Sequence, residues 1–244
     1  MKTFEYQLNF ENESHYWWFV GRRRILAALI GKYLPGRCGL KILDAGCGTG
    51  IVLDDMSAIG RCYGVDYSVT ALRYCRQRNC RRVLAADIAN LPYADNSFDL
   101  ITVLGVLYQR SIIDDVKALK ELYRVCNPGG LLVSDESAFP ILANKHNERV
   151  NGAHRYVQSE MRLKLTAAGF RVVKISYWNL MLFPAFLALK FLERNRTDRG
   201  FTDLSRQINP FINRVLTAYL TLEARLIRHI NLPLGTSMFS VAIK

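Results

Sequence analysis

The chain has 244 residues, of which 50% are hydrophobic, and this length favours one domain with an elaboration over two equal domains. Its six cysteines are scattered, without a Cys-x-x-Cys pair or histidine spacing suited to zinc, so no metal site is expected and a reduced, cytoplasmic protein is predicted. The amino terminus lacks the apolar core of a signal peptide, and the net charge of +12 indicates an anionic partner without identifying it.

The first 36 residues are expected to form a helical segment. It contains a run of arginines at 22–24, an apolar helical run at 25–33, and before them a dense aromatic group made of His15, Tyr16, Trp17, Trp18 and Phe19. One interpretation is an amphipathic helix that packs its aromatic side chains on the domain and leaves the arginines in solvent. The other is a lid, in which Trp17, Trp18 or Phe19 folds over a ligand site and excludes water.

Residues 41–50 read Lys-Ile-Leu-Asp-Ala-Gly-Cys-Gly-Thr-Gly. They predict a short buried strand with Asp44 at its carboxyl end, followed by a turn of Gly46, Gly48 and Gly50 that opens a helix and lets a ligand touch backbone. The spacing does not fit a dinucleotide-binding motif, because the third glycine of that motif is missing. It does not fit a phosphate-binding loop either, because the chain has no Gly-Lys-Ser or Gly-Lys-Thr. The alternative is an ordinary strand-to-helix turn that binds no ligand.

The rest of the core alternates between strands and helices. Strands are predicted at 41–45, 61–66, 83–87, 98–106 and 130–135, with helices near 51–59, 69–78 and 112–125. A turn is predicted at 127–130, a further helix at 159–168, and two more strands at 170–177 and 238–244. This order predicts an α/β fold with a Rossmann-like, seven-stranded, doubly wound sheet, whose cofactor-binding core covers residues 37–178.

Residues 179–234 are predicted to form a helical cap before the final strand at 235–244. Its first part, 180–192, is apolar on all sides apart from Pro184 and Lys190. Its second part carries a helical stripe of Ile208, Phe211, Ile212, Val215, Leu216, Tyr219, Leu222, Leu226 and Ile230. Three interpretations of the cap are open. It could extend the core, or it could roof an apolar acceptor pocket. It could also lie on a membrane through residues 180–206, with its basic side chains toward lipid headgroups: Lys190, Arg194, Arg196, Arg199 and Arg206.

Three acids follow three successive strands: Asp44, Asp66 and Asp87. With the Asp-x-Gly-x-Gly-x-Gly turn, they make the chain resemble the class I S-adenosylmethionine-dependent methyltransferases from about residue 42 to residue 177. The resemblance implies a last strand that enters antiparallel between the fifth and sixth. The aromatic group, Leu182-Phe183-Pro184 and residues 232–237 are similar to a methyltransferase type 11-like subgroup suggested to act in glycan or secondary-metabolite pathways.

The resemblance implies S-adenosylmethionine as the cofactor. The glycine turn, including Cys47, would approach the methionine part, and Asp44 would balance its ammonium group. Asp66, followed by Tyr67, would accept hydrogen bonds from the ribose hydroxyls. The remaining expected contacts are the adenine ring with Asp87 and Ile88, and the sulfonium with Leu104 and Gly105 at the end of the fourth strand.

General-base chemistry is expected from the segment after the fifth strand, because the acid and histidine common after the fourth strand are replaced by Leu107-Tyr108-Gln109-Arg110. His154 is the leading candidate, His146 the second, and Tyr156 would orient the acceptor. The similar subgroup commonly has His-Asp where this chain has His146-Asn147. Both histidines could instead be ordinary polar loop or capping residues.

The expected function is methyl transfer to a small-molecule, glycan-linked or lipid-linked acceptor at a hydroxyl oxygen. An RNA methyltransferase would account for the positive charge, but the sequence lacks the Asn/Asp-Pro-Pro-aromatic motif and the Pro-Cys pair of such enzymes, and no stable nucleic-acid complex is expected. A non-catalytic cofactor-binding scaffold is the other alternative. A cytoplasmic location, with peripheral contact on the inner face of the membrane as a further hypothesis, completes the prediction.

Overall fold

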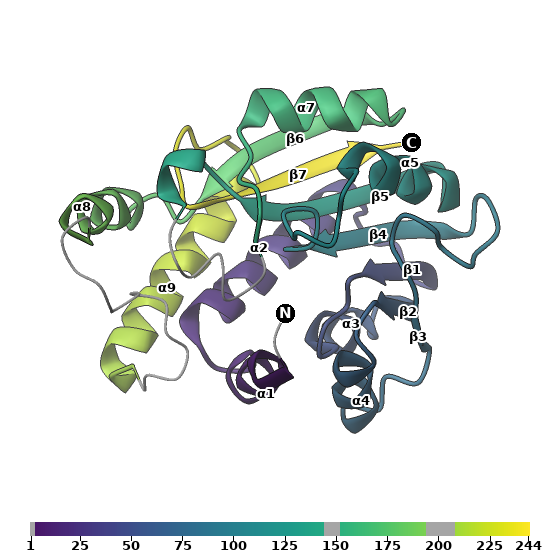
Figure 1. The fold of residues 1–244 in the computed structure, drawn as a ribbon, viewed down its shortest axis with the longest axis horizontal. Coiled ribbons are helices and arrows are strands. Elements are labelled where there is room, and N and C mark those ends of the chain that lie inside the picture. The colour runs from purple at the N-terminus through teal and green to yellow at the C-terminus, as the bar shows by residue number, and fades with distance from the viewer. Residues whose placement is uncertain (1–2, 144–151, 194–207) are drawn as a thin grey trace.

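A computed structural model describes residues 3–143, 152–193 and 208–244 of the chain. Their centre is a seven-stranded sheet in the order β3-β2-β1-β4-β5-β7-β6 (Figure 1). The strands are β1 (Leu40–Ala45), β2 (Gly60–Asp66), β3 (Val83–Ala85), β4 (Phe98–Leu104), β5 (Cys126–Ser137), β6 (Arg171–Trp178) and β7 (Ser237–Ile243). The first five are parallel, and β7 is antiparallel to β5 and β6 between them, which confirms the predicted fold class.

Helices cover both faces of this sheet. Along the chain they are α1 (Thr3–Asn12), α2 (Trp17–Tyr33), α3 (Ile51–Met56), α4 (Val69–Gln77), α5 (Asp115–Val125), α7 (Gln158–Ala167), α8 (Phe183–Glu193) and α9 (Pro210–Ile227), with a short 3-10 helix at Pro140–Leu142. Three of them begin at side chains that cap free backbone amides: Ser68 accepts from Ala71, Asp114 from Lys117 and Asn209 from Phe211.

The two faces follow from alternation along the strands. Leu43 of β1 packs in a cluster with residues of α5 and α7, whereas the preceding Ile42 packs in a second cluster with residues of α2 and α9. Figure 1 shows α5 and α7 on one side of the sheet and α2 and α9 on the other. Because the strands are covered on both sides, they are apolar almost throughout, which is the pattern that made them predictable.

One predicted turn is part of a strand. Residues 127–130 lie inside β5, where Cys126 pairs with Phe98 but Leu131 pairs with Leu100, so four residues face one on the neighbouring strand. The side chain of Asn127 donates to Asp99 Oδ1 at 2.7 Å across this irregular stretch. The proline and glycines therefore form a bulge rather than a connection before the strand, which corrects the prediction.

The amino-terminal aromatic group lies largely inside the molecule. Trp17 and Phe19 are 5% and 6% exposed, and Trp18 packs on Trp178 of β6 with ring centroids 5.7 Å apart. This agrees with the packing interpretation for Trp17 and Phe19. Among the described residues, no helix has the length and apolar character needed to cross a membrane.

Candidate cofactor site

The glycine turn follows β1 at the carboxyl edge of the sheet. Gly46, Gly48 and Gly50 have φ angles of +82°, +53° and +90°, a left-handed region that side chains with a Cβ rarely occupy. A Cβ on Gly46 would lie 2.3 Å from Val106 Cγ2, whereas a Cβ on Gly48 would meet nothing within 4 Å. Gly46 is therefore required for packing, and Gly48 borders open space that a ligand can occupy.

Asp66, at the end of β2, ties the turn to the sheet. Its Oδ2 accepts from the amide of Gly48 at 2.9 Å and its Oδ1 from the amide of Ser68 at 2.8 Å. Burial raises the pKa of this carboxyl, and the two amides act against that rise. A carboxylate has roughly four acceptor positions, so lone pairs remain for the hydroxyls of a ribose.

Asp44, at the end of β1, is a buried acid beneath the turn. It accepts a hydrogen bond from the hydroxyl of Thr102 on β4 at 2.6 Å. Burial raises its pKa to about 6, while the Thr102 hydrogen bond and the charge of Arg22 act in the opposite direction. A cationic ligand group beside Asp44 would favour the ionised carboxylate and compensate its charge.

Arg22 of α2 reaches the same edge of the sheet. Its Cζ lies 4.8 Å from the ring centroid of Trp18, its Nε is buried without a hydrogen-bond partner, and its Nη1 would be 3.7 Å from a Cβ on Gly105. Its positive charge opposes the rise that burial causes in the pKa values of Asp44 and Asp135. The expectation that residues 22–24 are all in solvent is therefore wrong for Arg22, because the surrounding indole and phenyl rings hold it against the site.

Asp135, at the end of β5, is a functional candidate that the sequence analysis missed. It is buried beside Leu104 in the neighbouring strand and accepts from Trp178 Nε1 at 2.8 Å. Burial raises its pKa to about 7, against the charge of Arg22 and the indole hydrogen bond. The available signal was its position, since it is another acid at the carboxyl end of a parallel strand.

The next residue, Glu136, fixes the loop after β4. Its carboxylate accepts from the backbone amides of Val106, Leu107 and Tyr108 at 3.2, 2.9 and 3.1 Å. Burial raises the pKa of Glu136 to about 8, and these amides act to lower it. Glu136 thereby holds in place the loop whose Val106 side chain packs on Gly46.

Other predicted cofactor residues line the same edge with different exposure. Asp87 is exposed, and its Oδ1 accepts from the amide of Ala89 at 2.9 Å. Tyr67 is 83% exposed, whereas Ile88 is buried in the α5 side of the core. Gly105 has a φ of +70° and follows the buried Leu104.

Cys47 lies inside the glycine turn and points into the protein. Its Sγ is 3.8 Å from Sγ of Cys75 on α4, and the hydrogen bond between the two thiols and burial raise its pKa. Contact with a cofactor is therefore expected through the backbone of Cys47, as for the glycines beside it.

Comparisons with known proteins agree with this geometry. Residues 43–134 match the methyltransferase domain family. Residues 43–134 thus form a methyltransferase domain. The matched span runs from the strand before the glycine turn to β5, and so contains Asp44, Asp66, Asp87 and the turn itself.

Solved methyltransferase structures share the fold over almost the whole chain. One is a chain in the complex between the Haloferax volcanii Trm112 methyltransferase activator and a methyltransferase, with a TM-score of 0.63, 17% identity and coverage of 98% of this chain and 97% of that one. Another is an S-adenosylmethionine-dependent methyltransferase from Mesorhizobium loti, with a TM-score of 0.59, 19% identity and coverage of 90% and 95%. At these identities the likeness concerns the fold alone.

Sequence relatives match the cofactor-binding part. The demethylmenaquinone methyltransferase of Mycobacterium sp. (strain JLS) is 41% identical over 121 residues, 49% of either chain. That of Staphylococcus aureus (strain MRSA252) is 34% identical over 138 residues, 53% of either chain. The chain thus spans about half the length of the curated relatives it matches.

The predicted acid–base residues of this methyltransferase domain lie after β5. His154 is partly exposed, and its Nε2 is 2.8 Å from Glu160 Oε1 on α7. Tyr156 is buried, with its hydroxyl 3.0 Å from the carbonyl of Leu107 and 2.8 Å from Asp115 Oδ2. One hydroxyl proton cannot serve both acceptors and a substrate at once. His146 lies outside the described residues, and the roles of all three stay predictions.

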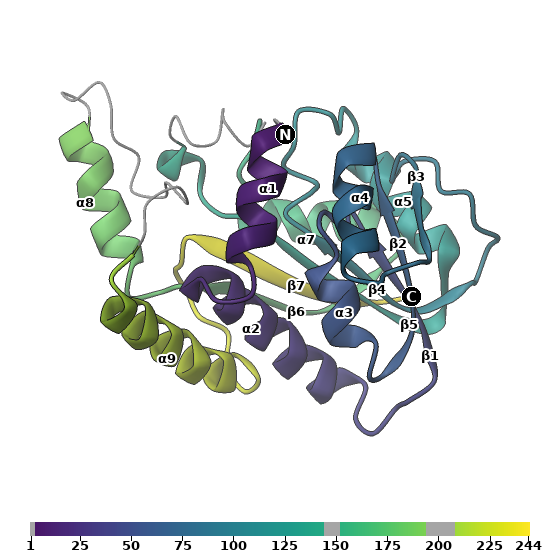
Figure 2. The same cartoon turned by 90° about the horizontal axis from the view of Figure 1, so that it is seen from below.

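The cover over the glycine turn of the domain is α1 and the turn that follows it. Glu13 is buried, accepts from the Thr49 hydroxyl of the glycine turn, and pairs with Arg78 at 2.7 Å. Burial and, after it, the charge of Asp66 raise the pKa of Tyr6, and a hydrogen bond with Ser68 acts to lower it. Figure 2 shows α1 alongside α4. These contacts hold α1 and the turn after it against the glycine turn, and the lid role of the aromatic group stays a prediction.

Proposed function

We propose that this chain transfers the methyl group of S-adenosylmethionine to a hydroxyl oxygen of an apolar small molecule or lipid-linked acceptor. The observation that carries the proposal is the arrangement around the end of β4. Asp44 and the glycine turn lie on one side of Leu104 and Gly105, and Asp135 lies on the other. The glycine turn and a second buried carboxyl therefore lie next to each other at this edge.

On the cofactor side, each residue type suits one part of the ligand. Asp44 would offset the ammonium group, the open side of Gly48 would face the methionine part, and Asp66 would accept from the ribose hydroxyls. Asp87 and Ile88 would hold the adenine. The bound cofactor supplies an electrophilic methyl on a sulfonium, and holding two reactants in line lowers a barrier by up to about 7–11 kcal/mol.

On the acceptor side, Asp135 is the proposed general base. It would take the proton that the acceptor hydroxyl releases as the methyl carbon exchanges its bond to sulfur for a bond to oxygen, and Trp178 Nε1 holds the carboxyl in place. A pKa near neutrality suits this task, because the group is both ionised and basic under working conditions. His154 with Glu160 is the competing base.

The acceptor class is inferred from two sources. Trp18 and Phe19 lie against Arg22, and Trp178 packs on Trp18 and donates to Asp135. Such rings favour a flat or apolar acceptor. Relatives of the matched region are named demethylmenaquinone methyltransferases, which supports an acceptor with a quinone-like ring. A glycan-linked metabolite with an apolar part is compatible with the same surroundings.

The test of the cofactor is calorimetric titration with S-adenosylmethionine and S-adenosylhomocysteine. We expect micromolar binding by the wild-type chain and a roughly tenfold to hundredfold loss for Asp66→Ala, because hydrogen bonds to a charged group contribute about 1.5–3 kcal/mol. Asp95→Ala is the matched control, since Asp95 is exposed and pairs with Arg124 away from the site. No binding at millimolar ligand would overturn the proposal.

The test of the reaction is transfer of a labelled methyl group to isoprenoid quinols and to lipid-linked glycans. Transfer that stops with Asp135→Asn supports the proposed base. Tight cofactor binding without transfer to any acceptor would instead favour the alternative of a non-catalytic scaffold.

A further inference from the structure

α9 presents a row of large apolar side chains to solvent. The six residues of this row, here called the α9 face, are each between 46% and 73% exposed: Phe211, Ile212, Val215, Leu222 and Leu226 of α9, and Ile230 just after its end. A contiguous exposed apolar row on one helix is the kind of surface that marks a contact with another molecule or a membrane. The predicted apolar stripe thus lies largely outside the protein core.

The inward packing of α9 uses other residues. Leu220, Ala224 and Ile227 are buried against α2 and the sheet, and the approach is so close that a Cβ on Gly21 would lie 2.2 Å from Leu220 Cδ1. Because a helix turns once in about 3.6 residues, positions 211, 215, 222 and 226 fall together on the opposite side. The α9 face is therefore not needed to hold the helix in place.

Basic side chains follow one edge of the α9 face. Exposed arginines at positions 214, 225 and 228 lie along α9, and α2 adds Arg24 and Lys32 at the same edge. The two helices are joined there, since Arg24 donates to the Thr221 hydroxyl and Lys32 to the carbonyl of Arg228. The single acid within α9, Glu223, is buried and accepts from the amides of Asn179 and Leu180.

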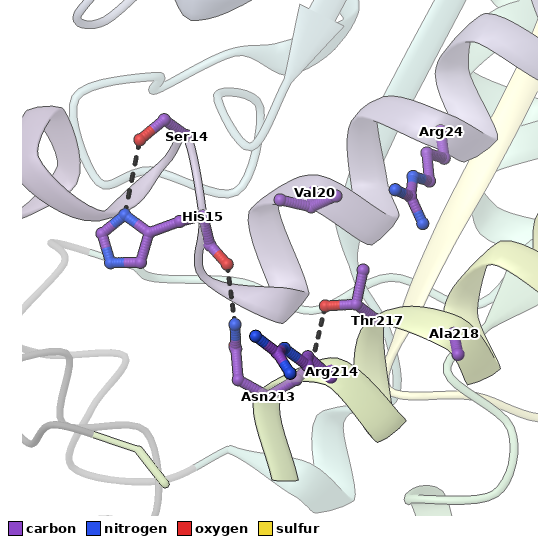
Figure 3. Close-up of a pocket in the computed structure, with 8 residues that line it drawn as sticks. All are labelled: Ser14, His15, Val20, Arg24, Asn213, Arg214, Thr217 and Ala218. Carbon is purple, nitrogen blue, oxygen red and sulfur yellow. Dashed lines mark hydrogen bonds between the residues drawn. The ribbon is translucent and has the colours of Figure 1, made fainter. Parts of the chain in front are cut away.

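A shallow groove lies beside this edge. It has a volume of about 400 Å³ and is lined from the turn before α2, from α2 and from α9 by Ser14, His15, Val20, Arg24, Asn213, Arg214, Thr217 and Ala218 (Figure 3). Its wall is fixed by Asn213, whose side chain donates to the His15 carbonyl at 2.9 Å and accepts from the Trp17 amide at 2.8 Å. Two guanidinium groups at one groove suit a phosphate.

We propose that the α9 face rests on an anionic bilayer surface, with its apolar residues among the acyl chains and a lipid phosphate in the groove at Arg24 and Arg214. An amphipathic helix with arginines on its polar edge is the form that lies in a membrane interface. The location differs from the membrane contact predicted at 180–206, much of which lies outside the described residues.

Charge favours a bilayer over a second copy of the chain. A two-fold contact through the α9 face would bring the same cationic edge of both copies together, with no exposed acid on either α9 to pair with it. An anionic bilayer supplies the opposite charge, and each basic side chain near it adds roughly fivefold to the binding constant. The net charge of +12 acts in the same direction.

The experiment is flotation of the full chain with vesicles of phosphatidylcholine alone or mixed with phosphatidylglycerol. The wild type should float with the mixed vesicles and stay behind with pure phosphatidylcholine. The double variant Leu222→Glu/Leu226→Glu should lose at least tenfold in binding, and Arg214→Gln/Arg225→Gln roughly tenfold to thirtyfold. The matched control is Leu163→Glu, because Leu163 of α7 is 71% exposed on the other side of the sheet.

Circular dichroism and thermal unfolding check that each variant is folded. The flotation experiment needs no cofactor or acceptor, so a negative result would leave the proposed function unaffected. Wild-type levels of flotation by the Leu222→Glu/Leu226→Glu variant would overturn the proposal. So would a wild type that fails to float and sediments as a dimer that this variant separates, because the α9 face would then be a self-interface.

Discussion

At the scale of single residues, Asp135 sets the expected pH dependence of turnover. Its pKa is raised to about 7, so the base form grows as pH rises, and kcat/KM should increase through about pH 7 and then level off. Asp135→Asn keeps an oxygen that accepts from Trp178 but cannot take a proton. We expect a loss of roughly 10²–10⁴ in kcat/KM and no limb near pH 7 in a profile measured from pH 5.5 to 9.

His154→Ala separates the two candidate bases. If Asp135 is the base, the His154 variant keeps the wild-type pH profile and its turnover changes little, since His154 is partly exposed and pairs with Glu160. The opposite result, a wild-type profile for Asp135→Asn and a lost limb for His154→Ala, would return the role to the residue predicted from sequence. Cofactor affinity should be unchanged in both variants.

Two neighbouring glycines should fail in different ways. Gly46→Ala places a Cβ 2.3 Å from Val106 at a positive φ, so we expect the free energy of unfolding to fall by about 2–5 kcal/mol. Gly48→Ala meets nothing within 4 Å and should cost only about 1–2 kcal/mol, yet its Cβ occupies the open space at the turn and should weaken cofactor binding. Urea unfolding and calorimetry measure the two effects, and wild-type cofactor affinity of Gly48→Ala would contradict the assignment.

At the scale of elements, Glu13 anchors α1 over the glycine turn. Glu13→Ala leaves the Thr49 hydroxyl and Arg78 without this partner, which should cost about 1–3 kcal/mol and loosen α1. Hydrogen exchange followed by mass spectrometry should show faster exchange in residues 3–12 and weaker cofactor binding. Glu11→Ala is the control, because its exposed side chain bonds only to Gln7 among the described contacts. Equal exchange in both variants would exclude an anchoring role.

The elements that were predictable are those with local signals. Parallel strands covered on both faces are continuous apolar runs, and the glycine turn is defined by its own spacing. The bulge at 127–130 was missed because proline and glycine signal a turn equally well inside a strand as before it. The stripe on α9 was visible, but an amphipathic pattern does not say what covers it.

The part of the site that could not be predicted is built by tertiary packing. Arg22 reaches the sheet edge only because α2 packs its aromatic residues inward, and Asp135 becomes a near-neutral acid only when Trp178 of a later strand closes over it. Neither the residue types nor their spacing in the sequence indicates these two contacts. The acids at the ends of β1 and β2 were found because their role depends on one strand and one turn.

At the scale of the whole molecule, buried acids should make stability fall as pH rises. The pKa values of Asp44, Asp135 and Glu136 are raised to about 6, about 7 and about 8, above the values of about 3.9 for Asp and about 4.3 for Glu in an unfolded chain. Between about pH 4 and pH 8 the folded chain therefore binds more protons than the unfolded one, and the slope of the unfolding free energy against pH is negative. The stabilisation that comes from protonation of these buried acids is fully present below about pH 4 and is lost as pH rises above their pKa values in the folded chain.

Urea unfolding at pH 5, 6.5 and 8 measures this slope. Asp135→Asn should flatten it and raise the unfolding free energy at pH 8 by about 1–4 kcal/mol, because one unit of pKa shift corresponds to about 1.36 kcal/mol. Saturating cofactor should flatten the part that belongs to Asp44, since a cationic group beside that carboxylate favours its ionised form. The two contributions are separable because only the second depends on the cofactor. If neither the Asp135→Asn substitution nor saturating cofactor changes the slope, other groups control the pH dependence of folding.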